Sequence, residues 1–164
     1  MVSFASRFGV YVHFPYCLSK CPYCDFASVV AAEVPHARYR DAIAAELARR
    51  AEEHGRPATG VESLYFGGGT PSIWDPACVA STIETVDRLF GLAPGAEVTL
   101  EANPGASDAS RFATLRAAGV NRLSIGVQSF HPRILGGLGR RHTPDEAVRA
   151  YEKARAARSE EHTS

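Results

Sequence analysis

The chain has 164 residues, of which 18 are Lys or Arg and 18 are Asp or Glu, so its formal net charge is zero. A hydrophobic fraction of 45% and a charged fraction of 22% are typical of one globular domain and exclude a wholly disordered chain. Neutrality gives no electrostatic reason to expect a nucleic acid or an anionic membrane as a partner. No apolar run approaches the roughly 20 residues that cross a bilayer, so we expect no transmembrane segment. The N-terminus lacks the pattern of a secretory signal, and we therefore expect a cytoplasmic protein.

The first half of the chain is predicted to contain two strands, each followed by a helix. Residues 8–14 are aromatic and β-branched and end at a proline, which is typical of a buried strand. After a loop of cysteines, apolar residues recur every four positions over residues 36–54, which predicts an amphipathic helix. A second strand over 61–66 ends at three glycines. Asp75 and Pro76 then provide an N-cap and a first-turn proline for a helix to about Phe90.

The second half repeats this alternation. A third strand over 97–101 is followed by a short helix over about 107–118, and a fourth strand over 121–127 by a helix capped at 143–146. Apolar strands alternating with helices predict an α/β fold with a parallel sheet of about four βα units. Four units cannot close an eight-fold barrel, which typically needs about 250 residues. We therefore expect part of a (β/α) barrel.

The most informative feature is a loop with the pattern C-x3-C-x2-C, formed by Cys17, Cys21 and Cys24. Three thiolates from one loop could bind three corners of an iron–sulfur cubane and leave the fourth iron open to a ligand. A structural zinc site would need a fourth ligand, which His13 or Asp25 would have to supply from awkward positions. Unligated cysteines are a third possibility, although exposed thiols are chemical liabilities. The spacing favours the cluster.

Three other motifs stand directly after predicted strands. A run of glycines at 67–69 would let the backbone approach a ligand closely, although such a run is more often a plain turn. Glu101 ends the third strand and could accept hydrogen bonds, although a solvated acid is the ordinary alternative. Gln128 ends the fourth strand and offers a donor and an acceptor. The carboxyl ends of parallel strands form the ligand-binding edge of α/β folds, so these motifs are predicted to meet there.

Two further residues are expected to be structural. His13 is predicted to be a hydrogen-bonded strand histidine, and Cys78 a small core residue at the start of a helix. Neither is assigned to the site.

The segments 11–17 and 24–26 resemble the radical S-adenosylmethionine (SAM) superfamily. More narrowly, they resemble the oxygen-independent coproporphyrinogen III oxidases and their relatives, the HemW-type haem chaperones. The resemblance extends from about residue 8 to residue 157. It implies a [4Fe-4S] cluster on the three loop cysteines, with the methionine part of SAM bound to the open iron. In that superfamily, reduction cleaves SAM to give a 5′-deoxyadenosyl radical.

The resemblance also implies residues that contact SAM. The glycine run and Thr70 match a segment that contacts the methionine amino group, and Glu101 matches a glutamate placed for the ribose hydroxyls. Arg140 matches an arginine twelve positions after the strand-end glutamine. Tyr11 and Tyr23 match aromatic positions near the cofactor, although each could equally pack in the barrel. The implied SAM-site residues are Tyr11, Tyr23, Gly67, Gly68, Gly69, Thr70, Glu101, Gln128 and Arg140.

Two functions of different kinds stay open within this resemblance. The oxidases carry a fourth cysteine two positions after the third, where this chain has Phe26. The segments 100–105 and 119–130 are also closer to the haem chaperones, so we expect a haem chaperone, with a genuine oxidase acting by radical decarboxylation as the alternative. Haem or porphyrin and an electron donor are expected as partners of the full-length protein only. A zinc-binding structural domain is a distant alternative.

The resemblance places residues 1–157 in the N-terminal part of a radical SAM core domain. Residues 158–164 depart from it, and their sequence is the translation, in one frame, of a common sequencing-adapter DNA. We therefore expect a non-native tail, with a genuine polar terminus as the alternative. The chain is expected to be a fragment that is inactive by itself.

Overall fold

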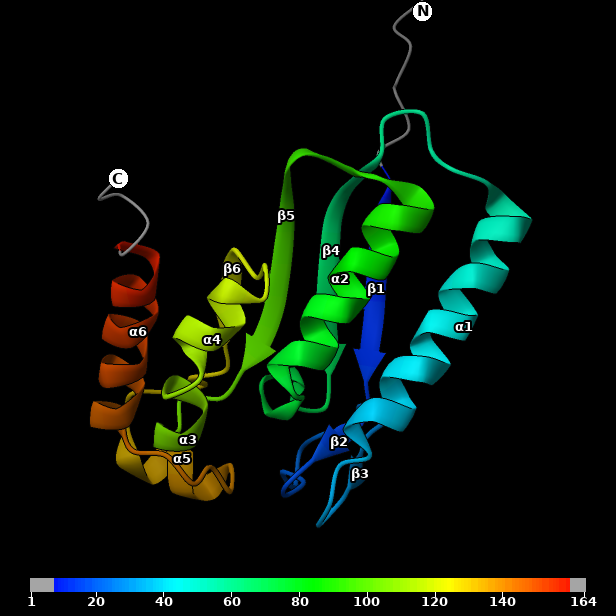
Figure 1. Ribbon diagram of the computed structural model, residues 1–164. Coiled ribbons are helices and arrows are strands. Elements are labelled where there is room, and N and C mark those ends of the chain that lie inside the picture. The colour runs from blue at the N-terminus through cyan, green and yellow to red at the C-terminus, as the bar shows by residue number, and fades with distance from the viewer. Residues whose placement is uncertain (1–7, 160–164) are drawn as a thin grey trace, which may run out of the picture.

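The computed structural model describes residues 8–159, and its centre is a four-stranded parallel sheet. The strands are β1 (Gly9–Phe14), β4 (Val61–Gly68), β5 (Leu92–Ala102) and β6 (Arg122–Ile125). Their order in the sheet is β1-β4-β5-β6, and each neighbouring pair is parallel. The predicted α/β fold of about four βα units is confirmed, with all strand ends at one edge (Figure 1).

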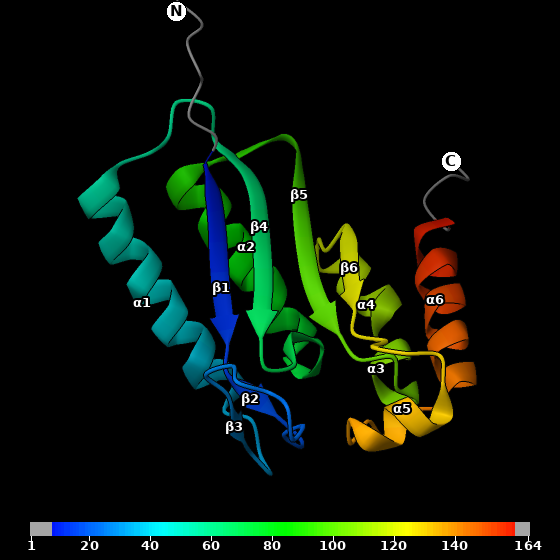
Figure 2. The same cartoon turned by 180° about the vertical axis from the view of Figure 1, so that it is seen from behind.

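Three long helices follow the strands, α1 (His36–His54), α2 (Pro76–Phe90) and α6 (Pro144–Ser159), and α4 (Phe112–Ala117) is a short one. The helices α1 and α2 lie together on one face of the sheet, and α6 lies at its β6 end (Figures 1 and 2). Figure 2 shows the opposite face of β1, β4 and β5, which no described helix covers. Within residues 8–159 no helix is both long and apolar enough to cross a membrane.

This one-sided cover explains the burial along the strands. In β1, Val12 and Phe14 point into the core, whereas Tyr11 between them is 55% exposed. In β4, Leu64 and Phe66 are fully buried while Tyr65 between them is only partly buried. These two strands therefore alternate, in contrast to the apolar strands that we expected from the sequence, whereas Val98, Thr99 and Leu100 of β5 are buried in succession. A parallel sheet with helices on one face only needs apolar side chains on that face only.

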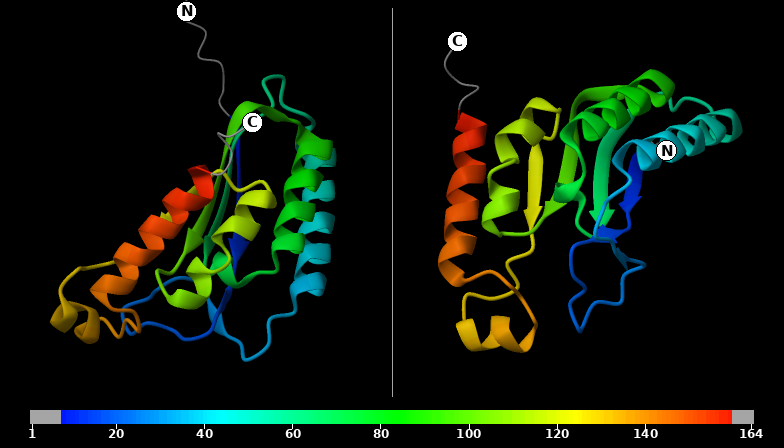
Figure 3. Two further views of the ribbon diagram at one scale, coloured as in Figure 1. Left: turned by 60° about the vertical axis from the view of Figure 1, so that its left-hand side comes forward. Right: turned by 60° about the horizontal axis from the view of Figure 1, so that its bottom comes forward.

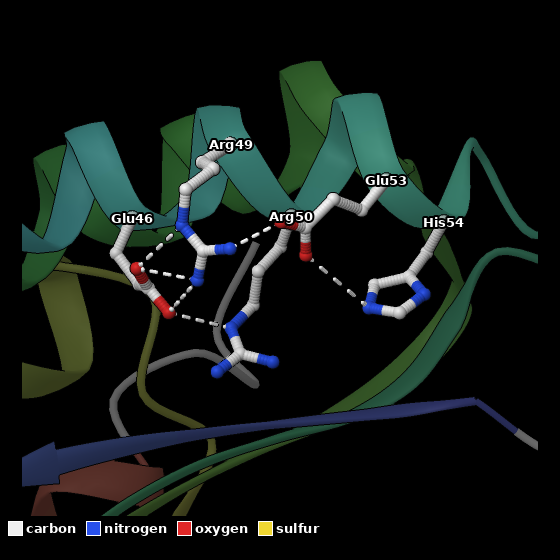
Figure 4. A network of polar contacts seen from close by, with 5 residues as sticks. All are labelled: Glu46, Arg49, Arg50, Glu53 and His54. Atoms are coloured by element: carbon white, nitrogen blue, oxygen red, sulfur yellow. Dashed lines mark hydrogen bonds and ion pairs between the residues drawn. The ribbon is translucent and has the colours of Figure 1, made fainter.

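The solvent-exposed face of α1 carries several ion pairs (Figure 4). Arg49 Nη2 and Arg50 Nε donate to Glu46 Oε1 at 2.8 and 2.7 Å, and Arg49 also pairs with Glu53. These side chains are about half exposed, so water screens each pair and the pairs contribute little to stability. Leu47 on the other face is buried, which is the amphipathic pattern that the sequence predicted.

The structure adds elements that the sequence pattern did not predict. Residues of the cysteine loop form a small parallel pair, β2 (Tyr16–Cys17) with β3 (Val29–Val30). A short helix α5 (Pro132–Gly137) precedes α6, and a single 3-10 turn, η1 (Pro71–Ile73), follows the glycine run (Figure 3).

The predicted helix over 107–118 is two helices, α3 (Ala106–Ala109) and α4, separated by a turn. In that turn the Arg111 side chain donates to the carbonyl oxygen of Trp74 at 2.7 Å, which ties the interruption to the core. The third strand is longer than predicted and begins at Leu92, and the fourth is shorter.

Two expectations concern the ends of the chain. The N-terminal segment 1–7, where no secretory signal is expected, lies outside the described residues. The predicted non-native tail begins at residue 158, and residues 160–164 also lie outside them.

Candidate functional site

One cavity of about 470 Å³ lies at the carboxyl edge of the sheet. This volume is in the range of about 300–1,000 Å³ that is usual for small-molecule and cofactor sites. Its walls come from the loop that follows each strand of the sheet. They contain the cysteine loop, residues 68–70 (the glycine segment), Glu101, Gln128 and Arg140. The predicted meeting of these motifs at one sheet edge is therefore what the structure shows.

The cysteine loop is closed at its base by the β2–β3 pair. Cys17 is buried at the end of β2, where its carbonyl oxygen accepts a hydrogen bond from Ala31 N at 3.1 Å. Cys21 and Cys24 are partly exposed on a tight turn, in which Cys24 N donates to Cys21 O at 3.0 Å. All three thiols are free and line the cavity. The loop thus presents three potential ligands to one space.

All three thiols lie in the wall of the same cavity. Among residues 8–159, no three His, Cys, Asp or Glu side chains lie close enough to hold a single metal ion. A cubane binds each thiolate through a different iron, so its ligands surround a volume, whereas a structural zinc ion needs four ligands around one centre. The donor set, three free thiols in the wall of one cavity, fits an iron–sulfur cluster.

His13 is engaged away from the cysteines. Its Nε2 donates to the carbonyl oxygen of Ala27 at 2.8 Å, and its Nδ1 accepts from the Tyr11 hydroxyl at 3.2 Å. Both ring nitrogens are used, in line with the expectation of a hydrogen-bonded strand histidine. Because Ala27 closes the cysteine loop, this histidine ties the loop to β1.

The glycine segment is fastened to its neighbours through its N–H groups. Those of Gly68, Gly69 and Thr70 all donate within the protein. Their acceptors are Glu101 Oε2 (3.0 Å), Phe14 O (2.6 Å) and Tyr16 O (2.9 Å). Contacts from these residues' backbone to a ligand would therefore come from carbonyl oxygens, which suit a ligand that donates, such as an amino group.

Glu101 is half-buried at the end of β5. Its carboxylate accepts from Tyr65 Oη at 2.8 Å as well as from Gly68 N, and a carboxylate has about four acceptor positions. Partial burial raises the pKa of Tyr65, and the hydrogen bond to Glu101 raises it further. With two hydrogen bonds accepted, Glu101 retains acceptor capacity, and it lines the cavity.

Two of the expected contact residues do not line this cavity. Tyr11 stacks on Tyr65 with ring centroids 6.0 Å apart, on the open face of the sheet. Gly67 lies beside the same two rings, where an added Cβ would come within 2.8 Å of the Tyr65 ring. Both residues therefore lie beside the Tyr65 ring and outside the cavity wall. Tyr23, in contrast, lies in the cavity wall.

Gln128 has an unusual backbone. Its φ of +65° is the one positive value among non-glycine residues of the described chain. Such a conformation costs free energy and is concentrated at binding and catalytic sites. Gln128 follows the short strand β6 and lies in the cavity wall.

Arg140 reaches into the centre of the site. Its Nη2 donates to Gly126 O at 2.8 Å and to Asn103 Oδ1 at 2.7 Å, while its Nη1 lies 3.5 Å from Cys21 Sγ. Its Nε is buried and has no partner within residues 8–159, so the site contains an unused donor. Tyr23 lies close by, and burial raises its pKa while the positive charge of Arg140 opposes that shift.

The cavity residues that were not predicted from the sequence include Asn103, Asp108 and His142. The Asp108 carboxylate is buried and accepts from Ser72 Oγ at 2.9 Å and from Asn103 N at 3.0 Å. Burial raises its pKa, and these hydrogen bonds oppose that shift. The Asn-Pro-Gly sequence directly after the third strand is the signal in the sequence that could have indicated Asn103.

His142 should make the stability of the protein depend on pH. Its Nε2 donates to Val127 O at 3.0 Å, and burial lowers its pKa. Below its unperturbed pKa of about 6.5 the unfolded chain binds a proton that the folded protein resists, so stability is lost as the pH falls through the folded pKa. Urea unfolding between pH 7.5 and pH 5 should show this loss, and His142→Gln should flatten it. Replacement of the exposed His131 by glutamine is the control, and an equal flattening there would contradict the assignment.

The fold and site together define a class of protein: a parallel α/β sheet whose carboxyl-edge cavity is built around a three-cysteine loop. The sequence profile of the radical SAM superfamily matches residues 11–164, and the chain belongs to that superfamily. Membership implies, in general, a [4Fe-4S] cluster and SAM as cofactors.

Individual proteins of this superfamily are similar to the chain over most of its length. The chain is 44% identical over 148 residues to "Heme chaperone HemW" of Escherichia coli (strain K12), covering 89% of this chain and 38% of the relative. It is 41% identical over 153 residues to "Radical S-adenosyl methionine domain-containing protein 1, mitochondrial" of Mus musculus, covering 93% and 34%. The solved coproporphyrinogen III oxidase (HemN) of Escherichia coli, a radical SAM enzyme, superimposes with a TM-score of 0.80 at 28% identity, covering 92% and 34%. The chain thus spans just over a third of the length of these proteins.

Proposed function

We propose that this chain is the cofactor-binding part of a haem chaperone related to coproporphyrinogen oxidase. The observation that carries the proposal is the arrangement of Cys17, Cys21 and Cys24 around one cavity, in a chain similar to haem chaperones over nine-tenths of its length. In this proposal the three thiolates hold a [4Fe-4S] cluster. When bound and reduced, the cluster supplies the electron that cleaves SAM.

The other cavity residues would hold SAM against the cluster. The carbonyl oxygens of the glycine segment would accept from its amino group, and the free acceptor positions of Glu101 would take the ribose hydroxyls. Gln128 supplies an amide, and Arg140 supplies a positive charge beside Cys21 for a carboxylate. The unpartnered Nε of Arg140 supports such a role, since a buried N–H normally has an acceptor.

SAM binding tests this assignment. After anaerobic reconstitution, SAM should change the EPR spectrum of the reduced cluster. Glu101→Gln and Gln128→Ala should each weaken binding by about 1–3 kcal/mol, because a polar group of the ligand loses its partner. Glu97→Gln is the matched control, since Glu97 is on the same strand but pairs with Arg122, away from the cavity. An unchanged spectrum at saturating SAM, or equal losses in all three variants, would contradict the assignment.

The oxidase is the second candidate, because the fold superimposes on coproporphyrinogen III oxidase. Phe26 stands where the oxidases carry a further cysteine, which favours the chaperone. The full-length protein containing this segment separates the two: tight haem binding without coproporphyrinogen decarboxylation supports the chaperone, and decarboxylation supports the oxidase. An electron donor as partner and a cytoplasmic location belong to the same proposal.

A further inference from the structure

Two of the three cysteine sulfurs are joined by a continuous chain of side-chain hydrogen bonds. Thr70 Oγ1 donates to Cys17 Sγ at 3.5 Å, and Asn103 Nδ2 donates to Thr70 Oγ1 at 3.4 Å. On the other side, Arg140 donates to Asn103 Oδ1 at 2.7 Å and to Cys21 Sγ at 3.5 Å. The three linking residues come from the loops after β4, β5 and β6, so the chain spans the width of the cavity.

The chemistry of these groups fixes the direction of every bond. A guanidinium group only donates, so the oxygen of the Asn103 amide must face Arg140 and its nitrogen must face Thr70. The Thr70 hydroxyl accepts that N–H and is left to donate its own proton to Cys17. An aspartate at position 103 could not donate, and an apolar residue could do neither. The chain therefore requires an amide in the middle.

The centre of this chain is held from a second side. Asn103 N donates to Asp108 Oδ2, and the same carboxylate oxygen accepts from Ser72 Oγ. Both Asp108 and Ser72 are buried, with 5% and 0% exposure. Thr70 and Cys17 are also buried, at 8% and 7%, so water competes little for the bond between them. Buried hydrogen-bond networks of this kind order the groups that they contain.

We propose that Asn103 is a positioning residue for the cluster, acting through Thr70 on Cys17 and through Arg140 on Cys21. The inference rests on the proposed function in so far as a cluster is bound there. Hydrogen bonds to the sulfur ligands are among the factors that set the reduction potential of iron–sulfur clusters. A donor directed at a thiolate stabilises the additional negative charge of the reduced state. The chain should therefore raise the potential and make the cluster easier to reduce.

The test compares Thr70→Val, Asn103→Leu and the double variant of the 164-residue chain. After reconstitution, EPR-monitored redox titration should show a lower midpoint potential in each single variant. Measured at the wild-type midpoint, the ratio of reduced to oxidised cluster should fall by up to about tenfold, equivalent to about 59 mV for a one-electron couple. Because Asn103 acts on Cys17 only through the Thr70 hydroxyl, which Thr70→Val already removes, the double variant should shift by less than the sum. Ser124→Ala, in the same cavity but contacting Tyr65 rather than a sulfur, should leave the potential unchanged.

The apoprotein gives a reading that does not depend on the cluster. The losses of unfolding free energy in Thr70→Val and Asn103→Leu should also be less than additive, since coupled residues deviate from additivity. Additive losses there, or unchanged potentials in the single variants, would overturn the role of Asn103. If the wild-type chain binds no cluster, the proposed function fails, and the apoprotein cycle still decides whether the hydrogen-bond chain exists. Thr70→Val is nearly isosteric, which keeps the test available if Asn103→Leu folds poorly.

Discussion

Replacing any one of Cys17, Cys21 and Cys24 by alanine should abolish the visible charge-transfer absorption of the reconstituted protein. The three thiols line one cavity and come from one loop, so the loss of one leaves two protein ligands for a cluster that the proposal gives three. Iron–sulfur clusters depend on thiolate ligation. Absorption spectra together with iron and sulfide per chain, measured after anaerobic reconstitution, check the expectation.

Cys78 provides the matched control. It is the fourth cysteine of the chain, but it lies in α2 with 5% of its surface exposed and belongs to the hydrophobic core. Burial raises the pKa of its thiol, which disfavours the thiolate that binds metal. Cys78→Ala should keep full absorption and lose only some stability. Absorption that survives in the triple loop variant, or stoichiometric zinc without iron, would contradict the cluster assignment.

The parts of this fold that the sequence predicted are those determined by local pattern. The helix over 36–54 was predicted with its observed bounds, because four-residue periodicity acts within the segment itself. The three cysteines were found for the same reason, since their spacing within one loop is visible without knowledge of the fold. The chemistry of strand ends was predictable because parallel strands end at one edge.

The parts that were not predicted depend on contacts between distant segments. Strands β2 and β3 are two residues each, too short for any periodicity, and they exist because Tyr16–Cys17 pairs with Val29–Val30. Asn103 looks like a turn residue in the sequence, and only the approach of Thr70 and Arg140 shows its other contacts. The positive φ of Gln128 likewise could not be predicted from the sequence, because glutamine has no preference for that conformation.

Tyr11 illustrates the opposite limitation. The sequence matches Tyr11 to an aromatic position near the cofactor, and in the structure its side chain lies against Tyr65 on the open face of the sheet and does not line the cavity. Strand residues alternate between faces, so a shift of one position along a strand decides which side chain reaches a site. A sequence motif identifies the end of the strand, and the geometry of the sheet determines which of its side chains reach the site.

Gly69 should be the least replaceable glycine of the site. A Cβ at this position would lie 2.6 Å from Tyr16 O, 2.9 Å from the carbonyl carbon of Pro15 and 3.0 Å from Cys17 Sγ. Two of these atoms are backbone, and the chain is held there by the bond from Gly69 N to Phe14 O at 2.6 Å. Neither partner can move without breaking the contact between the glycine segment and the cysteine loop. The glycine is required here by close approach rather than by an unusual φ.

Gly69→Ala should therefore destabilise the protein by about 1–3 kcal/mol, as overpacking does, and reduce the amount of cluster bound because Cys17 is displaced. Urea unfolding of the apoprotein and iron content after reconstitution measure the two effects separately. Gly136→Ala is the matched control: it lies in α5 with no atom within 4 Å of an added Cβ, and alanine favours a helix by about 0.5–1 kcal/mol. Glycine-to-alanine substitution should thus lower the free energy of unfolding at position 69 and raise it at position 136. If Gly69→Ala unfolds at the wild-type urea concentration and binds iron fully, the two loops are not packed against each other as described, and the cavity between them cannot have the walls assigned to it.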